Sequence, residues 1–392
     1  MTQVTQATQA GERRAAADLL YGQDETDLRE AVRSLLDDRA AWRDVLARVE
    51  TGQTCDTGLW RVLAADVGCA GLLVPESAGG AGASYREAAV VAEELGRALA
   101  PVPFLGSAVI AATALLAAGD DELTRLAAGG AVTVALALPF SASAAGGAVP
   151  AASVRLGAPA RGDEPGASRL TGEVRGVADA LAADILLVPA DAVPSGLYVV
   201  RAGDPGVSKA PVTSLDMTRQ LADLSFDGAP ARRIAGGDTA TRAVVSALTA
   251  GAGILASEQL GIAERCLEIT LAYVKERRQF ARPVGSFQAL KHRLADLWTA
   301  VVQARAAARY AAACLASADP DTAVAVALAK ATCSDVALKA AQEMIQLHGG
   351  IGFTWEHPAH LYLKRAKADS IGLGTSGAHR ASLAALADLP PA

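Results

Sequence analysis

The feature that most constrains the fold is a three-and-four spacing of apolar residues in the C-terminal half of the chain. Apolar side chains repeat in this way at Phe287, Leu290, Leu294, Leu297 and Val301. This period is typical of a helix that packs along one stripe. The segment before it, residues 255–274, carries two such stripes and is therefore apolar on two faces. A helix of that kind lies inside a bundle, so the pattern predicts antiparallel helices packed at about 20°.

The pattern changes along the 392 residues, which are enough for two or three domains. Residues 1–22 are polar and lack periodicity, so we expect a flexible tail. Residues 23–130 show helical spacing and predict an N-terminal helical domain. Residues 131–236 carry short β-branched runs between Gly and Pro, which indicates a small β-barrel or sandwich. Residues 237–392 then form a four-helix bundle, giving a mainly α fold with a β middle domain.

Bulk properties exclude several classes of protein. A net charge of -6 argues against a nucleic-acid-binding surface. Five widely spaced cysteines without a C-x-x-C pair argue against a disulfide framework or zinc ribbon. His357 and His360 lack the Glu and the further ligands of a zinc motif, so we expect no metal. No apolar stretch is long and unbroken enough for a membrane span, and we expect a cytoplasmic protein.

Local motifs spread along the chain resemble those of the acyl-CoA dehydrogenase family. They are Gly71–Gly82 with Glu93–Arg97, Tyr273–Phe280 followed by Gly285–Asp296, and Gln346–Phe353. The motifs occur in the family's order, from Asp27 almost to the C-terminus. This resemblance implies an FAD cofactor and an acyl-CoA or other acyl thioester substrate. It also implies an electron-transfer flavoprotein or similar electron acceptor.

The resemblance assigns cofactor contacts to particular residues. Arg277 matches the family's Arg-x-x-Phe arginine, which reaches the pyrophosphate of an FAD bound largely by a neighbouring subunit. A planar guanidinium suits that group because it donates two parallel hydrogen bonds. The other matching cofactor residues are Gln279, Phe280, Phe287, Gln288, Gln346, Gly349, Gly350 and Thr375. Since two chains share one site, the resemblance implies a homo-oligomer, or a hetero-oligomer with a second acyl-CoA dehydrogenase-type chain.

The chain departs from the family where the catalytic base belongs. The family's reaction needs a carboxylate that removes the α-proton of the thioester. That base stands in one of two places, and these are Leu373 and about Gly251 here. Glu258 and Asp369 are the remaining carboxylate candidates. Glu258 lies two turns beyond Gly251, roughly 10 Å along the helix, and a structural role in the bundle explains it better.

The middle domain also departs from the family, which leaves three functions open. Ala137–Phe140 and Asp184–Pro189 lack the Thr and Trp side chains that family members place against the flavin ring. The favoured function is the base-lacking subunit of a heteromeric enzyme acting on steroid- or polyketide-type acyl thioesters. One alternative is a stand-alone enzyme with a displaced base, acting on an unusual acyl-CoA or a carrier-bound acyl group. Another is a non-catalytic thioester-binding or scaffold homologue.

Overall fold

A computed structural model describes residues 19–145, 151–157, 168–191 and 196–388. Most of the tail expected over residues 1–22 therefore lies outside the described residues. Its last residues are not loose. The Tyr21 hydroxyl donates a hydrogen bond of 2.6 Å to Glu93, and the Arg309 guanidinium lies 4.0 Å from the centre of the Tyr21 ring. Residues 19–22 are thus attached to the helical body, in contrast to the expectation.

Helices form the N-terminal region, as their apolar spacing predicts. They are α1 (Gln23–Arg39), α2 (Trp42–Val49), α3 (Thr57–Arg61), α4 (Tyr85–Ala98), α5 (Ala112–Ala118) and α6 (Asp121–Ala128). Two π-helical segments, Val62–Asp66 and Phe104–Ala111, join this set. The start of α4 is fixed by a capping box, in which Ser84 and Glu87 each bind backbone N–H groups of the first turn.

The middle region is a closed barrel. Its described strands are β1 (Val134–Leu136), β2 (Val154–Gly157), β3 (Ser168–Ala178), β4 (Ile185–Ala190), β5 (Gly196–Arg201), β6 (Val207–Pro211) and β7 (Leu221–Gly236). The pairing runs β4-β2-β3-β7-β5 and returns to β4, so the ring has no open edge between these strands. The expectation of short strands is wrong for β3 and β7, which have 11 and 16 residues. Long strands are needed because β7 pairs with β3, β5 and β6.

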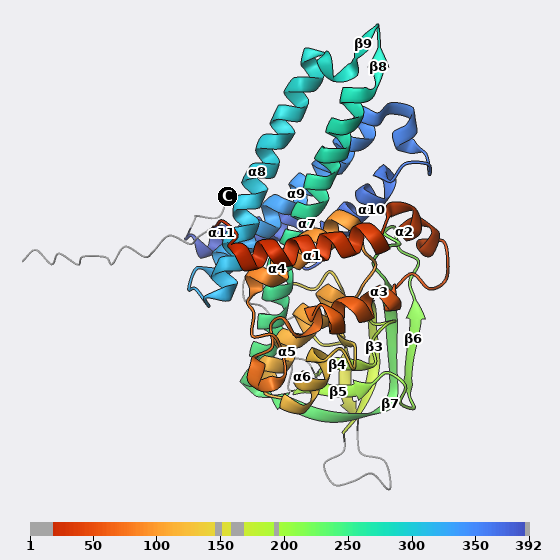
Figure 1. Ribbon diagram of the computed structural model, residues 1–392. Helices are drawn as coiled ribbons and strands as arrows, with labels where there is room; N and C mark the ends of the chain where they lie inside the picture. The colour runs from red at the N-terminus through yellow and green to blue at the C-terminus, as the bar shows by residue number, and fades with distance from the viewer. Residues whose placement is uncertain (1–18, 146–150, 158–167, 192–195, 389–392) are drawn as a thin grey trace, which may run out of the picture.

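A helical bundle completes the chain and confirms the predicted fold class. It consists of α7 (Gly237–Glu276), α8 (Gln288–Ala316), α9 (Thr322–His348), α10 (Ala359–Asp369) and α11 (Ser376–Leu386). A small hairpin of β8 (Arg278–Gln279) and β9 (Arg282–Pro283) joins α7 to α8. Figure 1 shows this hairpin at the far end of the bundle, opposite the barrel.

Helix α7 is the central element of the molecule. Its 40 residues span about 60 Å at 1.5 Å per residue. Among the described residues it alone is long and apolar enough to cross a membrane, but 83% of its most apolar window is buried inside the protein. It is therefore a core helix of the bundle, as its two apolar stripes predict.

Helices α4 and α7 cross at backbone contact, which glycine makes possible. A Cβ atom at Gly96 would overlap the backbone of Glu258, and one at Gly261 would overlap the backbone of Glu93. Small residues at such a crossing allow two helix axes to approach closely. The crossing joins the N-terminal helices to the bundle and brings Glu258 into the interior.

Candidate functional site

A buried cluster of charges joins the barrel to the bundle. Arg219, in the loop before β7, donates to both carboxylate oxygens of Glu258 on α7, at 2.7 and 2.8 Å. Arg365 on α10 donates to Glu258 Oε1 at 2.7 Å and to the Thr218 hydroxyl at 2.8 Å. Each of these charged side chains is less than 5% exposed. We call Arg219, Glu258, Arg365, Asp369 and Asp216 the arginine cluster.

Within the arginine cluster, the pKa values of Glu258 and Asp369 shift in opposite directions. Burial acts to raise the pKa of Glu258, but the charges of Arg219 and Arg365 outweigh it and lower the pKa to about 2. Burial, together with the charge of Glu258, raises the pKa of Asp369 to about 8. The oxygens of Asp369 lie 3.6 Å from Arg219 Nε and 3.5 Å from Arg365 Nε, without a hydrogen bond.

These environments argue against Glu258 and Asp369 as the base. Both oxygens of Glu258 are bound by guanidinium groups, so this carboxylate has little tendency to take a proton. Asp369 is fully buried among the same arginines. Neither residue lines a described cavity. Their geometry is that of a structural ion cluster that ties three segments together.

Residues 370–375, which we call the Leu373 loop, are fixed from three sides. Leu373 N donates to the carbonyl of Phe140 at 2.7 Å. Its own carbonyl accepts from His379 Nε2 at 2.8 Å. The buried Lys330 ammonium donates to the carbonyls of Asp369 and Gly374 at 2.9 and 3.3 Å. Leu373 itself has φ +54°, a left-handed conformation that these contacts hold in place.

Leu373 and Gly251, the residues matched from the sequence to the family's two base positions, lie close together in this chain. A Cβ at Gly251 would lie 3.1 Å from Leu373 Cδ1 and 2.8 Å from Ile110 Cγ1. Leu373 is only 2% exposed. Both positions therefore belong to one apolar contact, and neither offers a carboxylate to a substrate.

The residues matched to the cofactor motifs fall into two groups. Residues 277–288 and 346–350, which we call the bundle tip, lie at the hairpin end of α7 and α9. Tyr273, which precedes the first segment, and His348, which lies within the second, stack at 4.3 Å, and the Tyr273 hydroxyl donates to the His348 carbonyl. Of the residues matched to the cofactor motifs, Phe287 is half-buried and makes an edge-to-face contact with Phe280, while the exposed ones at the bundle tip are Arg277, Gln279, Phe280, Gln288, Gln346, Gly349 and Gly350.

Thr375 lies apart from the bundle tip. The carbonyl beside it, that of Gly374, is bound by Lys330 on α9. Lys330 precedes Gln346 by 16 residues, about 24 Å along the helix. The Thr375 hydroxyl accepts from Ala378 N at 3.2 Å and so caps α11. One chain thus brings together the bundle-tip residues but does not bring Thr375 to them.

The bundle tip fits a pyrophosphate, whereas the Leu373 loop does not offer the usual flavin contacts. The Arg277 side chain is exposed and has no ion pair among the described residues. Gly349 has φ +62°, which favours glycine and leaves its backbone open to a ligand. At the loop, the Phe140 ring packs where a Cβ of Gly372 would stand. Phe140 is also covered by the Arg219 guanidinium, 5.1 Å from its ring centre.

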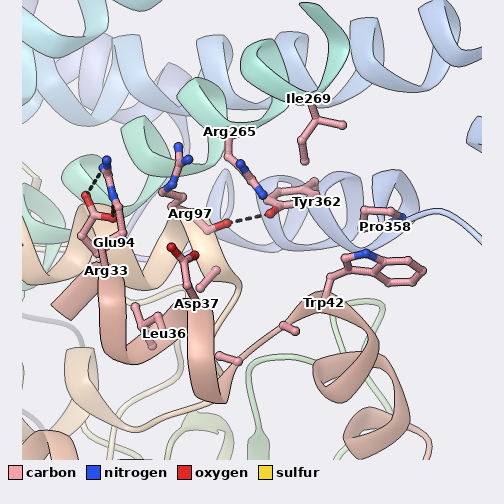
Figure 2. A pocket seen from close by; sticks show the side chains of 13 residues that line it. Arg33, Leu36, Asp37, Trp42, Glu94, Arg97, Arg265, Ile269, Pro358 and Tyr362 are labelled. Carbon is pink, nitrogen blue, oxygen red and sulfur yellow. Dashed lines mark hydrogen bonds and ion pairs between the residues drawn. The ribbon is translucent and has the colours of Figure 1, made fainter. Parts of the chain in front are cut away.

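A cleft of about 210 Å³ between α1, α4, α7 and α10 is a different kind of site (Figure 2). Its guanidinium groups are already paired. Arg33 binds Glu94 at 2.7 Å, while Arg97 and Arg265 both bind Glu268, at 2.5 and 2.8 Å. Tyr362 donates to the Arg97 carbonyl across the cleft. These charges neutralise one another, in contrast to the unpaired Arg277.

Sequence models of two family domains match this chain. The model of the acyl-CoA dehydrogenase N-terminal domain matches residues 22–127, and that of the acyl-CoA dehydrogenase C-terminal domain matches residues 241–387. The chain belongs to the acyl-CoA dehydrogenase family, whose members are flavoprotein oxidoreductases that bind FAD. Family membership confirms the resemblance, the fold class and the cofactor predicted from the sequence.

Within the family, the chain is similar to heteromer-forming and steroid-related members. It is 38% identical to acyl-CoA dehydrogenase IpdE2 of Mycobacterium tuberculosis, over 86% of this chain and 89% of that protein. The ChsE4-ChsE5 complex from Mycobacterium tuberculosis has a chain with 30% identity and a TM-score of 0.82, covering 96% of this chain and 100% of that one. A Tcur3481-Tcur3483 steroid ACAD variant has 31% identity and a TM-score of 0.81, covering 94% of this chain and 98% of that one.

Three groups that shape the site could not be assigned their partners from the sequence. Arg219 and Arg365 bind Glu258 from segments 39 and 107 residues away, so no local pattern connects them. The only sequence signal was an acidic residue within the apolar part of α7. His379 was not singled out, although it follows the altered Gly-Thr segment by one helical turn.

Proposed function

We propose that this chain is the base-lacking subunit of a heteromeric acyl-CoA dehydrogenase that forms an α,β double bond in an acyl thioester. One observation carries the proposal: Leu373 and Gly251, the two family positions for the base, share an apolar contact with Ile110. No carboxylate therefore stands at either position. The likeness to a chain of the ChsE4-ChsE5 complex, which contains two different proteins, supports a second chain as the source of the base.

The bundle tip would be this chain's contribution to catalysis. Arg277 would bind the FAD pyrophosphate of a site completed by the sister chain, with Gln346 and the Gly349 backbone beside the adenosine part. A bidentate guanidinium orients such a group as well as binding it. FAD, when bound, supplies the acceptor for the β-hydride. The distance of about 24 Å between Gln346 and the Lys330 contact of the Leu373 loop favours a cofactor shared by two chains.

We also propose a steroid-type acyl thioester as substrate and a cytoplasmic location. The substrate class rests on the likeness to a steroid ACAD. The location rests on the five cysteines, all of which are free thiols. An electron-transfer flavoprotein or a similar acceptor would reoxidise the cofactor, as is usual for this family.

The test is to express the full chain alone and together with each acyl-CoA dehydrogenase-type chain that copurifies with it. We expect the pair to have a hetero-oligomeric native mass and to lose flavin absorbance when an acyl-CoA is added anaerobically. The chain alone should not bleach its flavin, because it lacks a base. Bleaching by this chain alone at the rate of the pair would contradict the proposal and favour a displaced base.

A further inference from the structure

A cavity of about 350 Å³ opens beside the Leu373 loop. It lies among α7, α9, α11 and residues 143–145 of the barrel side, and its volume is within the usual range of small-molecule sites. Ala252, next to Gly251, lines it on α7, and Ala327 lines it on α9. The lining consists mainly of small apolar side chains with a few hydroxyl groups. Such a cavity suits an apolar ligand that carries few polar atoms.

Of the described residues that line this cavity, His379 alone is titratable. It is 3% exposed, and its Nε2 lies 2.8 Å from the Leu373 carbonyl oxygen. A carbonyl oxygen can only accept a hydrogen bond, so Nε2 must carry the proton. Burial lowers the pKa of His379 below its ordinary value and outweighs the opposing hydrogen bond to Leu373, which favours the neutral ring at pH 7. Nδ1 then holds a lone pair.

The Nδ1 atom has no hydrogen-bond partner among the described residues. Because His379 lines the cavity, a ligand with a donor group could form a hydrogen bond to this nitrogen that the chain itself does not supply. The Leu373 carbonyl fixes the tautomer, and the loop is in turn held by Phe140 and Lys330. The acceptor at Nδ1 is therefore set before any ligand binds.

We propose that this cavity binds a hydroxylated acyl group without reacting with it, and that His379 Nδ1 accepts a hydrogen bond from the ligand's hydroxyl. The proposal rests on the proposed function for its acyl thioester class. It goes further in assigning a non-catalytic acyl site to this chain and a specificity-determining residue within it. The absence of a carboxylate at Leu373 and Gly251 means that the bound acyl group keeps its α-proton.

Two substitutions of His379 distinguish the roles of its two ring nitrogens. His379→Gln places an amide N–H near the Nε2 position, so it keeps the bond to Leu373 but provides no acceptor at the Nδ1 position. His379→Asn places its amide near Nδ1, so it keeps an acceptor there but loses the bond to Leu373. Both variants replace a neutral ring by a neutral amide and leave the charge of the cavity unchanged.

The experiment is calorimetric titration of the full chain with octanoyl-CoA and with its monohydroxy derivatives, hydroxylated at carbons 3 to 7. At least one hydroxy isomer should bind about fivefold more tightly than octanoyl-CoA, as a hydrogen bond worth about 1 kcal/mol provides. His379→Gln should remove this preference while octanoyl-CoA affinity stays within about twofold. His379→Asn should retain part of the preference.

Three results would overturn the assignment: equal affinity for octanoyl-CoA and every hydroxy isomer, a preference that persists in His379→Gln, or no binding of any of these thioesters to the chain. These outcomes are distinct from a failure of the proposed function. That function is tested by bleaching of the flavin in the assembled pair, and the pair would still bleach if this cavity were empty of acyl groups.

Discussion

The bundle tip and the Leu373 loop correspond to two parts of one family site, yet they place their side chains in opposite environments. At the tip, Arg277 and Gln346 are exposed, and Arg277 has no charged partner among the described residues. At the loop, Leu373 is buried, and the nearby Arg219 and Arg365 are paired with Glu258 inside the arginine cluster. Polar groups at the tip are accessible to a ligand, whereas those near the loop form buried ion pairs that stabilise the fold. A chain can therefore keep exposed residues suited to binding the cofactor, while the residues at the former catalytic position pack as part of the hydrophobic core.

The largest effect is expected where a charge is structural. Arg365→Ala leaves Glu258 buried with one guanidinium fewer and leaves Thr218 without its donor. Removing one partner of a buried ion pair typically costs about 3–5 kcal/mol in the free energy of unfolding. Urea denaturation would measure this loss. The matched control is Arg380→Ala, whose pair with Asp335 is exposed and should contribute less than about 1 kcal/mol. Equal effects of the two substitutions would contradict a structural role for the arginine cluster.

Arg277→Ala tests an exposed charge that is available to a ligand rather than a buried structural one. This exposed residue contributes little to folding, so the free energy of unfolding should change by less than about 0.5 kcal/mol. Loss of a charge-assisted bond to the pyrophosphate should weaken FAD binding about 10- to 150-fold, or about 1.5–3 kcal/mol. Flavin retention after gel filtration of the assembled protein measures this. Arg242→Ala, an exposed arginine at the other end of α7, should retain flavin. Unchanged retention in Arg277→Ala would refute the assignment.

Leu373→Glu tests whether the Leu373 loop can accommodate the carboxylate that it lacks. The new carboxylate would lie against Ile110 and Gly251, so we expect a loss of about 1–3 kcal/mol relative to the neutral Leu373→Gln. Burial should raise the pKa of this glutamate in the folded state, so the loss should grow as pH rises from 5 to 8. Urea denaturation at both pH values measures it. A gain of α-proton exchange in a bound acyl-CoA would further show that the loop keeps the family's geometry.

Asp369→Asn tests a slope of stability with pH rather than a single loss of stability. The folded-state pKa of Asp369 is raised from 3.8 to about 8, so folding favours the protonated form. Its contribution is complete below about pH 4 and is lost as pH rises through 8, by at most about 1.4 kcal/mol per pH unit. The lowered pKa of Glu258 acts in the opposite sense, and its contribution is lost as pH falls from 4.5 toward 2. Denaturation between pH 5 and 8 should show a shallower fall in the variant than in the original chain.

Periodicity predicted the order of helices, strands and helices because it records which face of each element is buried. The stripes of α7 and α8 and the glycine stop after α9 are local features, and the structure contains all three. Strand β7 was harder to predict because it is rich in Ala, Asp, Arg and Gly and contains one β-branched residue, Ile234.

The site was only partly predictable for a related reason. The resemblance indicated the residues of the bundle tip and the altered base positions, because each lies within a short motif. That Leu373 contacts Gly251, and that Glu258 is held by two arginines, depends on how distant segments pack. The tautomer of His379 likewise depends on one carbonyl, which no sequence pattern specifies.

Because α7 is unbroken, it fixes the angle about the helix axis at which the hairpin of the bundle tip stands relative to Gly251 beside the Leu373 loop. Gly251 and Arg277 lie 26 residues apart on one helix without a proline, about 39 Å along the axis. Inserting a single residue between them would turn the hairpin by about 100° about the helix axis. An insertion of seven residues would nearly restore the angle but move the hairpin about 10 Å outward. Natural length variation in this family should therefore avoid this interval and collect in the loops between the helices.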